Sequence, residues 1–419
     1  MESRSAPVIP SRADHSDIRR NNLEVVLRNL SVRGPDSRAG IAARAGLTPA
    51  TVSRLVGELI DLGLVRETGP DQRMLPRRAG RPPTQLELDG RHVLALGAEV
   101  NVDYIAVLGT DLAGRTVHDT RLPFNAVDAG PGRSAAELAR LCRLAVKLLA
   151  RRRRDRPLVV AGLAVAVPGL VDTSNGLVTE APNLHWTGFP LGAALAAAEG
   201  LATVPVTIGN DANLGALAEY WVGSHAGVPN LVYVTGEVGI GGGVIAGGQQ
   251  LLGTHGHGGE IGHMNLDPTG PRCGCGRRGC WEALIGLGAL LRAAGGGEAA
   301  ARMAAPEAKV AVVADRARGG DATALAALRE LGHWVGVGAA NLVNIFDPQV
   351  IILGGYFRQI AQWILPPARL ALRAGVLAPG SGGCELTTSS LGFTAAARGG
   401  ALHVADEVMR HPAALAHAR

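Results

Sequence analysis

The chain has 419 residues, of which 47% are hydrophobic and only 3% aromatic, and its formal net charge is +5. This length and apolar content predict two or three domains whose cores are packed mainly by aliphatic side chains. The charge is uneven, because residues 1–91 hold 15 Arg against 11 Asp and Glu, a net of +4, and leave the remainder near neutral. The imbalance favours an N-terminal module that binds a polyanion.

No segment of the chain has the pattern of a signal peptide or a membrane span. Met1–Arg20 is polar and charged, and the longest apolar stretch, Pro157–Val171, contains Gly and Pro and is too short to cross a bilayer. We therefore expect a cytoplasmic protein with no membrane partner. In such a chain, the cluster formed by three of the five cysteines indicates a metal site rather than disulfides.

Residues 16–90 are predicted to form a winged helix-turn-helix domain, preceded by a disordered segment, 1–15. A first helix runs from Ser16 to Gly34, and a second is capped by Ser37 and stops at Gly46. A third helix starts with Thr48 as its N-cap, followed by Pro49 at its first position, and ends near residue 61. Two short strands, 64–68 and 84–88, flank a basic tip and form the wing.

The spacing of the second and third helices places the N-terminal side chains of the third in a DNA major groove. The candidate DNA contacts on this helix are Thr48, Ala50, Thr51, Ser53 and Arg54. At the wing tip, Arg77, Arg78 and Arg81 are candidates for minor-groove contacts. The partner predicted by this pattern is double-stranded DNA. The alternative is a three-helix interaction module with a solvated basic loop.

From residue 92 the pattern changes to alternating strands and helices. Buried strands are predicted at 93–98, 104–108, 158–167, 231–234 and 349–353. A capping box at 134–137 is predicted to open a helix that ends at 151–154. The strand at 204–208 is predicted to begin a second lobe, and 394–409 is predicted as a C-terminal helix.

The most specific local motif is one His and three Cys in the spacing H-x9-C-x-C-x4-C. The four residues are His263, Cys273, Cys275 and Cys280. Thiolates and an imidazole suit tetrahedral Zn²⁺, and four protein ligands leave no open position, so the predicted site is structural. The alternatives are cysteines that cluster without a metal, or a redox dithiol.

Two further motifs are candidates for ligand contacts. Asn210 and Asp211 follow a strand and precede a helix, where they can present polar groups to a sugar or cap the helix instead. The Gly-rich run 235–243 can bring backbone amides to a phosphate, although it contains Glu237.

Together these motifs resemble the ROK family of repressors, open-reading-frame proteins and sugar kinases, over essentially the whole chain. The segments in family order are 182–184, 210–211, 260–263, the Cys cluster and 344–355. The resemblance implies an α/β, two-lobed, actin-like (ribonuclease H-like) sugar-kinase fold. Its lobes would cover 91–204 and 205–419, and the C-terminal helix would return to the first. It also implies sugar contacts from Asn210, Asp211, Glu260, His263 and Glu282, with Asn183 and Gly169 in addition.

Two departures from the family's kinases point away from phosphoryl transfer. The first phosphate loop of the kinases, of the type Asp-x-Gly-Gly-Thr, matches a stretch that carries Glu99 and Asn101, and the second, Gly-Thr-Gly, matches Glu237-Val238-Gly239. A carboxylate about 4 Å from a phosphate charge costs on the order of 4 kcal/mol at an effective dielectric near 20.

The favoured interpretation is a sugar-responsive regulator of carbohydrate genes that binds its sugar without phosphorylating it. Such a regulator would act as a homodimer or homotetramer on an operator with two half-sites. The alternative is an active ATP-dependent sugar kinase with Asp211 as the base and a DNA-binding extension. A third reading is a body that is bound by a protein partner instead of a sugar.

Overall fold

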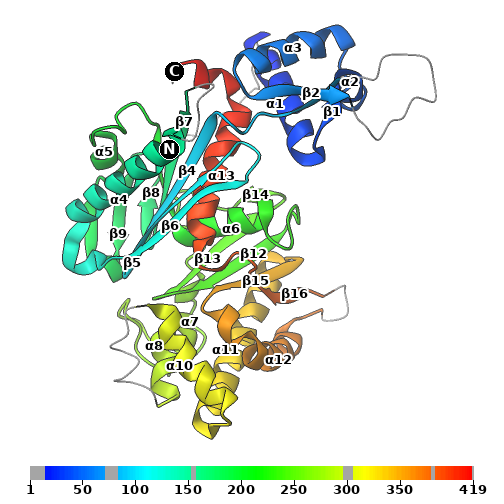
Figure 1. The fold of residues 1–419 in the computed structure, drawn as a ribbon. Helices are drawn as coiled ribbons and strands as arrows, with labels where there is room; N and C mark the ends of the chain where they lie inside the picture. Colours follow the sequence, from blue (N-terminus) through cyan, green and yellow to red (C-terminus); the bar gives the residue numbers. More distant parts are fainter. Residues whose placement is uncertain (1–14, 71–83, 152–156, 296–304, 379–382, 418–419) are drawn as a thin grey trace, which may run out of the picture.

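The computed structural model describes residues 15–70, 84–151, 157–295, 305–378 and 383–417 (Figure 1). A small N-terminal head is followed by two lobes, each built on a five-stranded sheet. Of the segment predicted as disordered, residues 1–14 lie outside the described part, and His15 begins the first helix. Within the described ranges, no helix is both long and apolar enough to cross a membrane.

The head is the predicted winged helix-turn-helix. It consists of α1 (His15–Arg33), α2 (Arg38–Ala45) and α3 (Pro49–Asp61), with β1 (Asp36–Ser37), β2 (Val65–Pro70) and β3 (Thr84–Leu88) in an antiparallel sheet of order β1-β3-β2. Both predicted caps are confirmed: Ser37 Oγ accepts from the Gly40 amide at 3.1 Å, and Thr48 Oγ1 from the Thr51 amide at 3.2 Å. Strand β1 was not predicted.

The first lobe contains a mixed sheet of order β11-β7-β4-β5-β6. Its strands are β4 (Val93–Val100), β5 (Tyr104–Thr110), β6 (Thr116–Pro123), β7 (Val159–Val167) and β11 (Val206–Asn210). Alternate residues of β4 point to opposite faces of the sheet. Leu94 and Leu96 belong to the core that includes α4 (Ala126–Arg151), whereas Val93 and Ala95 belong to a core shared with the head.

Two predictions about this lobe are wrong. The strand predicted to begin the second lobe is β11, and it pairs in parallel with β7 in the first sheet. The predicted capping box at Ser134 lies inside α4, because the helix is interrupted at Gly130 (φ 72°) and continues from there. Ser134 Oγ instead donates to the Gly130 carbonyl at 2.7 Å. A small antiparallel sheet, with α5 (Leu191–Ala196), completes the lobe; its strands are β8 (Leu170–Asp172), β9 (Leu177–Ala181) and β10 (Trp186–Phe189).

The second lobe contains a sheet of order β14-β13-β12-β15-β16. Its strands are β12 (Leu231–Gly236), β13 (Ile240–Ala246), β14 (Gln249–Gln250), β15 (Val350–Gly355) and β16 (Glu385–Thr388). One large core joins this sheet to the helices α7 (Trp281–Ile285), α8 (Leu287–Ala293), α10 (Pro306–Arg318), α11 (Ala322–Phe346) and α12 (Phe357–Gly375).

Helices α6 (Asp211–Val222) and α13 (Ala395–Arg410) pack against each other between the two sheets (Figure 1). Their backbones approach so closely that a Cβ on Gly399 would lie 1.8 Å from the Leu214 carbonyl oxygen. Helix α13 also packs on β4, β5 and β7, as predicted for a C-terminal helix that returns to the first lobe.

The far end of α13 carries the head. Arg28 of α1 forms an ion pair with the buried Asp406 at 2.7 Å. Val404 and Val408 of α13 belong to the same hydrophobic core as Val26 and Leu27 of α1. The head is therefore packed on the body through α13, not merely tethered to it.

Candidate functional site

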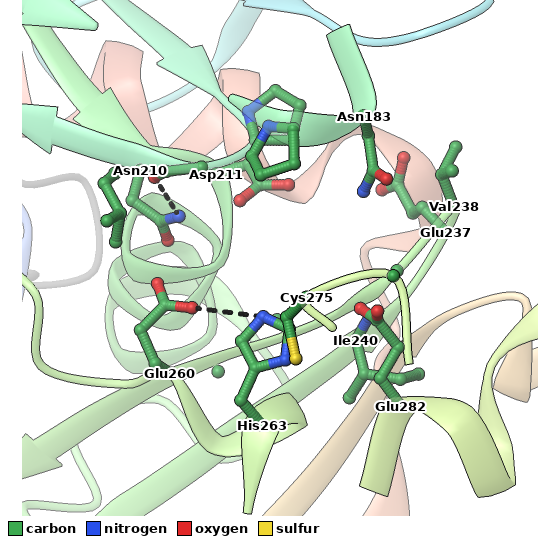
Figure 2. Close-up of a pocket in the computed structure, with 18 of the residues that line it drawn as sticks. Asn183, Asn210, Asp211, Glu237, Val238, Ile240, Glu260, His263, Cys275 and Glu282 are labelled. Carbon is green, nitrogen blue, oxygen red and sulfur yellow. Dashed lines mark hydrogen bonds and ion pairs between the residues drawn. The ribbon is translucent and has the colours of Figure 1, made fainter. Parts of the chain in front are cut away.

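A cleft of about 830 Å³ brings together all seven residues that the family resemblance implied as sugar contacts (Figure 2). These residues are Gly169, Asn183, Asn210, Asp211, Glu260, His263 and Glu282. Gly169 follows β7, and Asn183 lies in the short η1 (Pro182–Leu184). The others come from the start of α6, from η2 (Ile261–His263) with the residue before it, and from α7.

Asn210 caps a helix, and both Asn210 and Asp211 line the cleft. Asn210 caps α6, because its Oδ1 accepts from the Asn213 amide at 3.0 Å, and its Nδ2 donates to the Gly169 carbonyl at 3.0 Å. Asp211 presents its carboxyl to the cleft (Figure 2). Burial, together with the negative charges of Glu99 and Glu260, raises the pKa of Asp211 to about 7. A carboxyl with this pKa can accept or release a proton near neutral pH.

His263 faces two sites at once. Its Nε2 lies 4.0 Å from Glu260 Oε2 on the cleft side, and its Nδ1 lies 3.8 Å from Cys273 Sγ. Burial raises the pKa of Glu260. An imidazole that bound a metal through one nitrogen and a carboxylate through the other would be fixed in orientation, so a metal at the Cys cluster would hold His263 in place beside Glu260.

The four predicted metal ligands converge on one point. The ligand atoms of His263, Cys273, Cys275 and Cys280 all lie within 4.8 Å of one another, and the sulfurs of Cys275 and Cys280 are 3.6 Å apart. Thiolates bound to one tetrahedral Zn²⁺ at about 2.3 Å would be about 3.8 Å apart, so the cluster fits a metal of this kind. The tight turn requires Gly279 (φ +67°), where a Cβ would overlap the Asp267 carbonyl oxygen.

A second wall of the cleft is backed by a network of buried polar groups. Tyr104 OH donates to Glu99 Oε1 at 2.5 Å and approaches Glu237 Oε2 at 2.9 Å, and Asn101 Nδ2 donates to Glu237 Oε2 at 2.5 Å. Burial raises the pKa of Glu99 to about 6 and that of Glu237 well above its usual range. The two segments predicted to replace the phosphate loops therefore meet, one from each sheet.

The sequence did not identify two members of this wall. Tyr104 was predicted only as a strand residue, yet its hydroxyl joins the two carboxyl groups. The Arg121 guanidinium lies 3.8 Å from the centre of the Tyr104 ring and forms an ion pair with Glu307 of α10. Arg121 thus bridges the two lobes. Neither role has a local sequence signal, because each depends on contacts between distant segments.

Glu282 binds the Gly-rich turn between β12 and β13. Its Oε2 accepts from the Ile240 amide at 2.9 Å, and a Cβ on Gly239 would lie 2.4 Å from the same oxygen. The Glu282 carboxylate therefore accepts the hydrogen bond of an amide that was considered for phosphate binding. Glu282 lines the cleft as expected, but it also holds the turn in place.

The candidate DNA contacts of α3 lie on its outer side. Thr48, Ala50, Ser53 and Arg54 are exposed, whereas Thr51 is half-buried and its hydroxyl lies 2.9 Å from that of Thr48. The buried side of the helix carries Val52, Leu55, Val56 and Leu59. The wing-tip candidates Arg77, Arg78 and Arg81 lie outside the described residues.

Known proteins match both parts of the chain. The ROK family model matches residues 96–407, and the MarR family model residues 25–74. The xylose repressor of Bacillus spizizenii is 31% identical over 390 residues, 92% of this chain and 95% of that protein.

Two crystal structures are similar to this chain, one over nearly its whole length and one over about three quarters of it. A ROK family transcriptional regulator, a homologue of the Escherichia coli Mlc protein, has a TM-score of 0.76 at 27% identity over 94% of this chain and 97% of that one. A ROK family glucokinase from Streptomyces griseus, in complex with glucose and AMPPNP, has a TM-score of 0.61 at 28% identity over 74% and 98%. The regulator therefore covers more of this chain than the kinase does.

Proposed function

The chain belongs to the ROK family and is one of its sugar-responsive transcriptional regulators, and we propose that it holds a sugar in the cleft between its lobes without phosphorylating it. The observation that carries this proposal is the contrast within the cleft. The residues implied as sugar contacts line one cavity, while Glu237 on its surface and Glu99 buried behind it stand at the two segments that match the phosphate loops of the kinases.

In the proposed mechanism, Asp211, Glu260 and His263 accept or donate hydrogen bonds to sugar hydroxyls. Because Asp211 follows β11 of the first sheet, whereas Glu260 and His263 lie at η2, which packs on β13 of the second sheet, a bound sugar favours one relative position of the lobes over others. A ligand shifts such an equilibrium only through its different affinity for the two states. Helix α13 packs on the first sheet, on α6 and on α1 of the head, and α1 packs on α3. A change in the position of the lobes can therefore reach α3 through packed contacts.

The remaining parts of the proposal concern the metal, the DNA and the assembly. The His and Cys cluster holds a structural Zn²⁺ that fixes His263. Helix α3 contacts the major groove of an operator through Thr48, Ala50, Thr51, Ser53 and Arg54. A homodimer or homotetramer binds two half-sites, and the protein acts in the cytoplasm. The name of one relative makes D-xylose the first sugar to test.

The test is operator binding by the full chain, measured by fluorescence anisotropy across a panel of free pentoses and hexoses. We expect one sugar to change the operator affinity at least tenfold. Operator affinity that stays constant across the panel would contradict sensing, and a change caused only by an added transport or signalling protein would favour the third reading.

One observation favours the alternative function, an active sugar kinase. The pKa of Asp211, raised to about 7, suits a base that deprotonates a sugar hydroxyl. A coupled assay for ADP release with ATP and each sugar separates the two functions. Turnover that is lost in Asp211→Asn would establish the kinase, whereas the proposed regulator shows no sugar-dependent ADP release.

A further inference from the structure

Three aspartates are buried near the junction of the head and the body: Asp89, Asp111 and Asp406. Asp89 and Asp111 form ion pairs with arginines of their own segments, Arg91 at 3.0 Å and Arg115 at 2.7 Å. Asp406 differs from them, because it lies on α13 of the body and pairs with an arginine of the head.

The Asp406 carboxylate lies between two guanidinium groups. Arg28 Nη1 of α1 is 2.7 Å from its Oδ1, and Arg410 Nη2 of α13 is 2.8 Å from its Oδ2. The Asp406 side chain is only 4% exposed, whereas those of Arg28 and Arg410 are 36% and 45% exposed. A shift of α1 along α13 would therefore take one of two cations away from a carboxylate that water hardly reaches. Because a buried charge that loses its partner is strongly disfavoured, the pair resists such a shift.

The apolar contacts around this pair do not resist it in the same way. Val404 and Val408 of α13 share a hydrophobic core with Val26 and Leu27 of α1. Hydrophobic contacts are non-directional, so these side chains can keep most of their buried area after a small shift. A charged hydrogen-bonding pair has a defined geometry. The position of α1 on α13 is thus defined by Asp406 more than by its apolar neighbours.

The opposite end of α13 is held as firmly by the body. A Cβ on Gly97 of β4 would overlap the Ala397 carbonyl oxygen, and a Cβ on Gly399 would overlap the Leu214 carbonyl oxygen of α6. Helix α6 begins at Asp211, which lines the cleft. With the backbones in such close contact, α13 has little freedom to stay in place when α6 moves against it.

We infer that Asp406 is the positioning residue that couples the body to the DNA-binding head. Its ion pair with Arg28 keeps α1 in one position on α13 with and without sugar, so that a displacement of α13 is passed on to the head. The inference rests on the proposed function, because it names the contact through which the sugar signal leaves the body. Asp406 itself is not among the residues that line the described cleft.

The test is Asp406→Asn in the full chain, which keeps the size of the side chain and removes its charge. Fluorescence anisotropy gives the operator affinity with and without the sugar panel, beginning with D-xylose, and titration calorimetry gives the sugar affinity. We expect the change that sugar causes in operator affinity to fall from at least tenfold to less than threefold. Sugar affinity should stay within twofold of wild type, because the cleft is unaltered.

The adjacent carboxylate provides a matched control. Glu407 also pairs with Arg410, at 3.3 Å, but its side chain is 44% exposed. We expect Glu407→Gln to keep the sugar response within twofold of wild type. A response lost equally in Glu407→Gln would overturn the assignment to Asp406.

A second variant breaks the same pair from the head and serves if Asp406→Asn does not fold. We expect Arg28→Gln to lower the sugar response below threefold as well. The double variant should respond no less than either single variant, because both substitutions remove one interaction.

The remaining outcomes distinguish the inference from the proposed function. A sugar response within twofold of wild type in Asp406→Asn or Arg28→Gln overturns the inference and leaves the sensing function intact. Operator binding that is lost both with and without sugar also overturns it, because the pair would then be needed to form the head rather than to couple it. If no sugar changes the operator affinity of the wild-type protein, the proposed function and the inference are both wrong.

Discussion

The two walls of the cleft are built from the same types of residue but use them differently. On one wall, Asp211, Glu260 and His263 present polar groups to the cavity (Figure 2). On the other, Glu99 and Glu237 bond to neighbouring side chains of the protein. A carboxyl group that accepts hydrogen bonds from neighbouring side chains holds the structure together. One that has no such partner is available to a ligand. In the proposed function, this kinase-like fold keeps the wall that binds a sugar and fills the wall where a kinase would bind phosphate, which is why the fold alone does not define the activity.

The largest expected effect is on the stability of the wall that contains Asp211, Glu260 and His263, through loss of the metal at the His and Cys cluster. Cys280→Ser removes a buried ligand, and we expect loss of bound zinc and a loss of more than about 4 kcal/mol of stability, because metal binding contributes to folding. Metal analysis and thermal unfolding measure both. Cys384→Ser, outside the cluster, is the control. A metal-free protein with unchanged stability and sugar response would show that this wall does not depend on a metal.

The next effect concerns the carboxyl group at the centre of the same wall. Asp211→Ala removes a hydrogen-bond partner of the sugar, and we expect affinity to fall about tenfold to a hundredfold, the range for hydrogen bonds to charged groups. Titration calorimetry measures the loss, and operator affinity without sugar should not change. Unaltered sugar binding would place the ligand elsewhere.

A comparable loss, of operator affinity, is expected from a substitution in the head. This substitution separates DNA binding from sugar binding. Arg54→Ala removes an exposed cation of α3, and we expect operator affinity to fall about fivefold to a hundredfold, since a good contact to a base contributes about 1–3 kcal/mol. Sugar affinity should be unchanged. The matched control is Arg133→Ala, at an exposed position on α4 of the body.

The smallest expected effect is the pH dependence of stability that the buried Glu237 causes. The folded-state pKa of Glu237 lies above its ordinary value of 4.5, so folding takes up a proton between the two pKa values, and the free energy of unfolding falls as pH rises through that range. Glu237→Gln removes this dependence. We therefore expect the variant to raise Tm at pH 8 by about 2–4 °C relative to wild type, and to change it little at pH 4, where both side chains are neutral. The opposite trend, with a larger gain at low pH, would contradict the burial of an acidic Glu237.

The features that the sequence predicted correctly depend on local patterns. Ser37, Thr48 and Gly46 bound the helices of the head through bonds within a few residues. The spacing of His263 and the three cysteines is similarly short. The sugar contacts were implied by a family resemblance, and the structure places all of them in one cleft.

The features that were missed depend on contacts between distant segments. The strand after residue 204 has the pattern of any buried strand, and only its pairing with β7 assigns it to the first lobe. Ser134 and Glu137 have the spacing of a capping box, but Gly130 sets the interruption of the helix. Likewise, no local pattern shows that Tyr104 joins Glu99 to Glu237, or that Glu282 binds the Ile240 amide.

Helix α13 has a mechanical consequence. Close to its start it packs against Gly97 of β4, and near its end Asp406 pairs with Arg28 of the head. A helix of 16 residues is about 24 Å long, so a tilt of about 5° about its start moves the other end by about 2 Å. In the proposed dimer, α13 would act as a lever arm: a small rotation at the cleft would change the distance between the two copies of α3, because α13 packs on both the body and the head.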